Sequence, residues 1–131
     1  MTMRRLVIEG ANFHDTPGFY TEINRVFMAD ESWQLGPSLD AFNDLLHGGF
    51  GALRGDGPVT LIWRDFAKSR ADLGLAATRD YLTAKIARPD LFNAARFQAD
   101  LDALNAGTGQ SYFQILLEII AGHPRITLRP A

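Results

Sequence analysis

The sequence predicts an α/β fold in which a three-stranded parallel sheet is packed with helices. Short apolar runs that suit strands alternate along the chain with segments whose apolar residues recur at helical spacing. Strands that alternate with helices pair in parallel through right-handed crossovers. At 131 residues, the chain is expected to form a single domain over residues 1–131 with a core of its own.

The first strand and the first helix are marked by apolar patterns and turn residues. Residues 6–9 have the pattern of a short buried strand, which Gly10 ends. Pro17 and Gly18 then open an amphipathic helix. Four apolar residues share one face of this helix: Phe19, Ile23, Val26 and Phe27. Residues 29–37 are expected to form a loop.

A second helix is predicted from residue 39 to about residue 47. Ser38 is a preferred N-cap, because its hydroxyl can accept a hydrogen bond from a backbone N–H at the helix start. The apolar residues of this segment recur at helical spacing and would face the core: Leu39, Phe42, Leu45 and Leu46. Asp40 and Asp44 fall on the exposed side, where they repel each other by a few tenths of a kcal/mol. Because this repulsion destabilises the isolated domain, the pair favours the interpretation that this helix face binds cationic groups. The alternative interpretation is an ordinary solvated helix face.

The remaining elements follow the same alternation. Gly48 and Gly49 end the second helix, and residues 59–63 form the next strand before another helix. A last apolar helix at about 110–121 precedes a final strand at 125–128, and Glu118 lies on its polar stripe. The sequence pattern of residues 75–109 predicts two or three short helices, separated near Arg88–Pro89 and Ala106–Gly107. Their charges are mixed, which favours structural cladding over a functional lid.

Composition excludes several classes of protein. The chain has no cysteine, so disulfides, thiolate catalysis and cysteine-based zinc sites are absent. No apolar run approaches the length of a membrane span. The apolar run at residues 6–8 is cut off by Glu9 and is too short for a signal-peptide core, so a cytoplasmic location is expected.

The net charge of −2 is unevenly distributed. No Lys or Arg occurs between Arg25 and Arg54, so the acids there are expected to be uncompensated. Four acids lie in this segment: Asp30, Glu31, Asp40 and Asp44. A local acidic patch favours a basic partner and disfavours direct binding of nucleic acid, whose phosphates it would repel.

The motifs do not favour an enzyme, a cofactor or a metal. His47 and Asp44 have the spacing of a metal pair, but a third ligand is not evident. The Gly48–Gly51 run lacks the Gly-Lys-Ser/Thr ending of a phosphate loop, and there is no Gly-x-Ser-x-Gly elbow. Asp40 and Asp44 could form a carboxylate pair for acid–base chemistry, but a convex helix offers no water-poor pocket.

Three motifs occur along the chain in an order that resembles a known protein family. They are Gly36-x-x-Leu39-Asp40-Ala41-x-x-Asp44, then Trp63-Arg64-x-Phe66-x-x-Ser69, then the last helix followed by Ile126-Thr127. Together they resemble the barstar family of intracellular ribonuclease inhibitors, over roughly residues 3–74 and 110–129. The family fold is the same three-stranded parallel sheet with helices. Residues 75–109 therefore look like a helical insertion in a barstar-like domain.

The resemblance implies a function and a site. It implies an inhibitor that blocks a ribonuclease, barnase-like or another basic nuclease, with an acidic helix face. Asp40 and Asp44 match the two helix aspartates of the family, and Glu118 matches the glutamate on its last helix. The implied mechanism is phosphate mimicry, in which carboxylates bind the Arg and Lys side chains that would hold substrate phosphate.

The rim of the implied site departs from the family. Gln34 and Leu35 replace an aromatic pair, Pro37 and Ser38 replace an acid and an amide, and Asn43 replaces a tryptophan. Trp33 either stacks on a partner or covers the core beneath its loop. The expected partner-binding residues are Asp40, Asp44, Glu118, Trp33, Gly36, Asn43 and Ser38. Because the rim differs, the alternative is a barstar-like adaptor that binds an unrelated basic protein through the same face.

Overall fold

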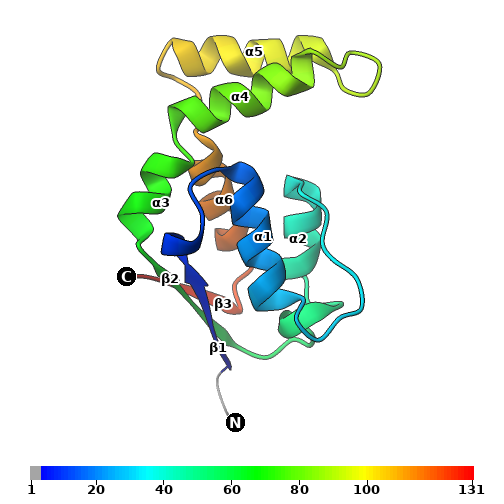
Figure 1. Ribbon diagram of the computed structural model, residues 1–131, viewed down its shortest axis with the longest axis vertical. Helices are drawn as coiled ribbons and strands as arrows, with labels where there is room; N and C mark the ends of the chain where they lie inside the picture. Colours follow the sequence, from blue (N-terminus) through cyan, green and yellow to red (C-terminus); the bar gives the residue numbers. More distant parts are fainter. Residues whose placement is uncertain (1–3) are drawn as a thin grey trace.

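The protein contains one three-stranded sheet with helices packed against it (Figure 1). The computed structural model describes residues 4–131. Strands β1 (Arg4–Glu9), β2 (Val59–Arg64) and β3 (Ile126–Pro130) are parallel, and β2 lies between the other two. This architecture confirms the predicted fold class, with each strand one or two residues longer than expected.

The sheet register aligns the core-facing side chains of neighbouring strands. Ile8 of β1 lies opposite Trp63 of β2, and both side chains are fully buried. Leu61 of β2 lies opposite Leu6 and Leu128 on its two sides. The central strand is buried along most of its length, as expected for a parallel strand covered by crossover helices.

Six α-helices form the crossovers (Figure 1). Their bounds are α1 (Thr16–Phe27), α2 (Leu39–Leu46), α3 (Phe66–Asp72), α4 (Leu75–Ile86), α5 (Ala94–Asn105) and α6 (Tyr112–Ala121), and short 3₁₀ turns occur at Gly10–Asn12 and Gly51–Leu53. Helix α1 starts one residue before Pro17, because Asp15 Oδ1 accepts a hydrogen bond from the Gly18 N–H at 2.8 Å. Among the described residues, every helix is too short or too polar to span a bilayer.

The core lies between the sheet and helices α1, α2 and α6. Phe19 from α1, Phe42 from α2 and Leu116 from α6 are fully buried. The ring of Phe19 stacks on Trp63 of the sheet at a centroid distance of 5.7 Å and meets Phe42 edge-on at 5.7 Å. The apolar faces predicted for these helices are therefore the faces that the fold buries.

The Trp63-to-Ser69 motif builds the junction between β2 and α3. The Trp63 indole N–H donates a hydrogen bond to Ser69 Oγ at 2.9 Å, and the Phe66 ring packs edge-on against Trp63. Gly10, at the end of β1, lies against this junction. A Cβ at Gly10 would come within 2.5 Å of the Arg64 carbonyl oxygen and 2.8 Å of Ser69 Oγ, so the close approach requires glycine.

Residues 75–109 fold as two helices of 12 residues each, α4 and α5, which lie side by side as a hairpin at one end of the molecule (Figure 1). The break between them falls at the expected Arg88–Pro89 position. After α5, Gly107 adopts a positive φ of 82°, which ends the helix where the Ala106–Gly107 pair predicted. Two helices, and not three, occupy this segment.

Candidate functional site

Helix α2 presents Asp40 and Asp44 to solvent, as predicted. The Ser38 hydroxyl accepts a hydrogen bond from the Ala41 N–H at 3.1 Å and caps the helix. The opposite face is anchored by residues with no exposed area, which are Phe42, Leu45 and Leu46. Both aspartates are exposed, and neither forms an ion pair within residues 4–131. These two charges are therefore free to meet a partner.

Helix α6 positions Glu118 through a reciprocal cap at its start. Ser111 Oγ accepts from the Gln114 N–H at 3.2 Å, and Gln114 Oε1 accepts from the Ser111 N–H at 2.8 Å. The helix is buried on its other side, so Glu118 faces outward. Glu118 Oε2 accepts a hydrogen bond from Gln110 Nε2 at 2.6 Å. This bond orients the exposed carboxylate of Glu118.

A cleft of about 390 Å³ lies between α2 and α6. Asn43 and His47 of α2 and Glu118 of α6 line it, together with His123, which follows α6. His123 Nε2 lies 2.8 Å from Asn43 Oδ1, and the ring of His47 meets the ring of His123 edge-on at 4.8 Å. The structure thus brings Glu118 to the side of α2, although the sequence separates them by about 75 residues.

Asp40 and Asp44 lie one turn apart on α2, beside this cleft but not among the residues that line it. On a helix surface, positions three and four apart are neighbours. Asn43 therefore neighbours Asp40, and His47 neighbours Asp44. The sequence analysis considered His47 only as a metal ligand and did not place either histidine on this surface, although the Asn43–His47 spacing of four residues marked one face of α2.

Asn43, one of the predicted partner-binding residues, makes a contact within the domain. Its side-chain oxygen is engaged by His123, so Asn43 links α2 to the end of α6. The side chain is partly buried in that contact. Asn43 therefore supports the position of the acidic helix, and its amide N–H₂ group is the part left for a partner.

The loop before α2 is tied to α1 and carries Trp33. Asn24 of α1 accepts a hydrogen bond from the Leu35 N–H at 2.7 Å and donates one to the Leu35 carbonyl at 3.2 Å. Trp33 is 47% exposed, and its ring packs on Phe50 at a centroid distance of 4.8 Å. Trp33 therefore has both a packed face and a face that a partner can contact. Gly36 is exposed, and a Cβ there would meet no atom within 4 Å.

One expectation about charge in this region is wrong. Glu31 is not uncompensated, because Arg54 Nη2 lies 3.4 Å from its carboxylate. The ion pair joins the loop to the segment after α2, and Arg54 lies at the very border of the segment that lacks Lys and Arg. A count of charges between Arg25 and Arg54 does not reveal the Glu31–Arg54 pair, because pairing depends on distance in space and not on separation along the chain.

The one deeply buried acid has a structural role. Glu22 of α1 is 2% exposed and accepts two hydrogen bonds from Arg25, at 2.7 Å each, one from Asn12 and one from the Glu9 N–H. Burial acts to raise the pKa of Glu22, but these hydrogen bonds outweigh it and hold the pKa below its ordinary value. The carboxylate joins α1 to the end of β1. Among the described residues, no group of three His, Asp or Glu side chains could hold a metal.

The fold is an α/β domain with an exposed acidic helix, and comparison with known families identifies its class. A family model described as Barstar (barnase inhibitor) matches residues 3–87. The chain belongs to the barstar family. Members of this family are inhibitors and not enzymes, which confirms both the resemblance and the expectation that the chain is no enzyme. Among curated proteins, none matches the chain.

The match begins at residue 3, includes all of β1 and extends through α4. They include α2 with Asp40 and Asp44, and the whole junction from Trp63 to Ser69. Helices α5 and α6 and strand β3 lie outside the match. The match therefore enters the segment of residues 75–109, and the interpretation of this segment as an insertion stays a prediction.

Proposed function

We propose that the protein inhibits a ribonuclease, barnase-like or another basic nuclease, by placing α2 and Glu118 over the enzyme's cationic active site. The observation that carries this proposal is the pair of exposed carboxylates on α2, Asp40 and Asp44, which lack ion-pair partners within residues 4–131. Family membership supplies the kind of partner.

The mechanism follows from the chemistry of carboxylates. Each carboxylate offers two oxygens to Arg or Lys side chains in charge-assisted hydrogen bonds, as a substrate phosphate would. We propose that Asp40, Asp44 and Glu118 form one contiguous acidic patch that occupies the phosphate-binding groups of the nuclease. The exposed charges also attract a basic enzyme over distance and raise the association rate. The same field disfavours direct binding of RNA.

The other residues of the face position or border this patch in the proposal. Ser38 caps α2 and Asn43 links it to His123, so both hold the aspartates in place. Trp33 offers an exposed aromatic surface at the border, and Gly36 leaves room for a partner's side chain beside it. The proposal places the protein in the cytoplasm, where a nuclease inhibitor protects the cell's own RNA, and it requires no cofactor or metal.

A titration of barnase with the purified protein tests this function. We expect RNA hydrolysis to fall in proportion to the protein added and to be restored when both Asp40→Asn and Asp44→Asn are introduced. Asp102→Asn on α5 is the matched control, since it removes one exposed charge whose described bond is to the neighbouring Gln98. Full nuclease activity in the presence of saturating protein contradicts a barnase-like target. The titration is then repeated with basic nucleases encoded beside this protein.

One observation favours a second candidate function. At the position where the family carries a tryptophan between the two aspartates, Asn43 is held by His123, so the rim presents a different surface. A barstar-like adaptor that binds an unrelated basic protein through the same face fits this change. Capture of a basic protein without nuclease activity, lost in the Asp40→Asn/Asp44→Asn variant and kept in Asp102→Asn, supports the adaptor.

A further inference from the structure

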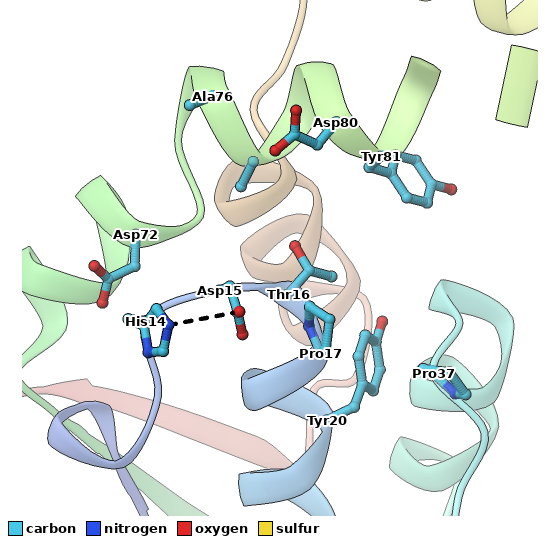
Figure 2. Close-up of a pocket in the computed structure, with 11 residues that line it drawn as sticks. His14, Asp15, Thr16, Pro17, Tyr20, Pro37, Asp72, Ala76, Asp80 and Tyr81 are labelled. Carbon is cyan, nitrogen blue, oxygen red and sulfur yellow. Dashed lines mark ion pairs between the residues drawn. The ribbon is translucent and has the colours of Figure 1, made fainter. Parts of the chain in front are cut away.

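A second cleft, of about 620 Å³, lies where α4 passes over the start of α1 (Figure 2). Its walls are apolar and aromatic. Pro17 and Tyr20 come from α1, Pro37 from the loop before α2, and Ala77 and Tyr81 from α4. The cleft therefore joins the proposed acidic face to the α4–α5 hairpin.

The cleft carries negative charge at its border. Three aspartates line it, and none of the described residues that line it is Lys or Arg. Asp72 is paired with Lys68 at 2.6 Å, and Asp15 caps α1 and lies 3.7 Å from Nε2 of His14, which also lines the cleft. Asp80 is exposed and forms no ion pair within residues 4–131, and Figure 2 shows its carboxylate beside the cleft. A free carboxylate at an apolar cleft selects for a cation with an apolar stem.

An unsatisfied hydroxyl also lies in the wall. Thr16 Oγ1 is buried and has no hydrogen-bond partner among the described residues. Its oxygen points toward α4 in Figure 2. A buried polar atom without a partner destabilises a fold unless a ligand or water supplies the missing bond. A donor N–H group in the cleft would satisfy it once the Thr16 side chain rotates toward the cleft.

The cleft is continuous with α2. Pro37, in its wall, precedes Asp40 by three residues. Burial, and then the charges of Asp40 and Asp100, raise the pKa of the Tyr81 hydroxyl above its ordinary value. The charge of Asp40 therefore reaches the α4 wall of the cleft. One partner can therefore contact both Asp40 and this cleft.

We propose that this cleft receives an arginine side chain of the basic partner, so that α4 extends the binding face beyond α2 and α6. This inference rests on the proposed function for the identity of the partner, but the cleft's preference for arginine does not. The methylene stem of arginine packs on Pro17, Ala77 and the Tyr81 ring. The guanidinium donates to Asp80 and to Thr16 Oγ1, since its planar fork offers several N–H donors. An acidic or phosphate-bearing ligand is repelled by the same border.

The first test uses a probe that does not depend on any nuclease. The full chain is titrated with N-acetylarginine methylamide and followed by the NMR shifts of the backbone amides of Thr16, Ala77 and Tyr81. N-acetylcitrulline methylamide, which has the same shape without the charge, is the matched probe. We expect saturable shifts with arginine and much smaller ones with citrulline. Equal shifts with both, or no shifts at these amides, overturn the proposal.

Variants locate the binding group. Asp80→Asn is expected to weaken arginine binding about fivefold, the size of an exposed charge pair. Asp102→Asn on α5 keeps wild-type binding and controls for net charge. Unchanged binding in Asp80→Asn means that Asp80 does not recognise the cation, which overturns the proposed mode.

The nuclease titration separates this inference from the proposed function. If barnase is inhibited, Asp80→Asn is expected to weaken inhibition about fivefold relative to Asp102→Asn. Inhibition that falls in Asp40→Asn but is identical to wild type in Asp80→Asn supports the proposed function and overturns the α4 extension. Arginine binding without inhibition of barnase supports the cleft and counts against barnase as the partner.

Discussion

His123 Nε2 lies 2.8 Å from Asn43 Oδ1, and this contact joins the end of α6 to the exposed side of α2 across 80 residues of sequence. The His47 ring packs edge-on against His123 and completes the link. Glu118 lies in the cleft that these three residues line. The contact therefore fixes the two helices that carry the proposed acidic patch relative to each other.

The His123 contact predicts a loss of stability at acidic pH. Burial, and then the charges of His47 and Arg125, lower the pKa of His123 below its ordinary value of 6.5. The folded state thus binds this proton less readily than the unfolded state. The contribution of His123 is complete above pH 6.5 and is lost as the pH falls through the lowered folded pKa.

Urea unfolding at pH 7.5 and pH 5.0 measures this effect. We expect the free energy of unfolding to drop more in the wild type than in His123→Gln, which cannot take up the proton. His14→Gln is the control, because the His14 side chain is 84% exposed and lies outside this cleft. An identical pH dependence in wild type and His123→Gln contradicts the prediction.

Asp44→Ala is expected to separate stability from binding. Removal of Asp44 relieves its repulsion with Asp40, so the free energy of unfolding should stay the same or rise by a few tenths of a kcal/mol. Partner binding should weaken by at least about 2 kcal/mol, because a desolvated cation on the partner is left unpaired. Urea unfolding and titration against the inhibited nuclease measure the two quantities. A clear loss of stability with unchanged affinity would make Asp44 a structural residue.

Association with a basic nuclease is expected to slow steeply as salt is added. The exposed carboxylates of α2 act over distance, and screening shortens their reach to about 8 Å at physiological ionic strength. Stopped-flow association rates between about 0.05 and 0.5 M salt measure the effect. The Asp40→Asn/Asp44→Asn variant should show a flatter dependence. A wild-type rate that does not change with salt means that these acids do not steer binding.

Ser69→Ala is expected to destabilise the fold by about 1–3 kcal/mol, because it leaves the buried Trp63 indole N–H without its acceptor. Both side chains are fully buried, so water cannot replace the hydroxyl without rearrangement. Chemical unfolding measures the change. Ser32→Ala on the exposed loop is the control and should have the stability of the wild type. A Ser69→Ala variant as stable as the control shows that the junction tolerates an unpaired indole.

The sequence predicted those elements whose signals are local. Helix α2 was placed within a residue because its cap, Ser38, and its apolar face coincide in a short segment. The predicted start of α1, at Pro17, lies one residue after the observed start at Thr16. The prediction used Pro17 and Gly18 as the start signal, whereas the N-cap is Asp15. Local capping chemistry was therefore informative, but competing start signals shifted one boundary.

Features that join distant segments were not predicted. The Asn43–His123 contact, the Glu31–Arg54 ion pair and the cleft beside α4 each depend on how elements pack in space. Periodicity shows which face of a helix is buried but not which element covers it. The helix pattern predicted that Asp40 and Asp44 are exposed, and the resemblance added Glu118 to the proposed patch, since it carried information on packing that the residue pattern lacks.

The α4–α5 hairpin has its own small set of buried side chains. Leu82 and Leu104 are buried in it, but neither belongs to the core cluster that packs on the sheet. The hairpin meets the body through Thr78, whose hydroxyl accepts the Tyr112 N–H at 2.7 Å, and through the Tyr81 ring. Such a unit can open locally while the sheet stays folded, so the amide hydrogens of α5 should exchange with solvent sooner than those of β2. Substitutions in this hairpin, which carries one wall of the proposed arginine cleft, are then expected to accumulate during evolution at little cost to the stability of the rest of the domain.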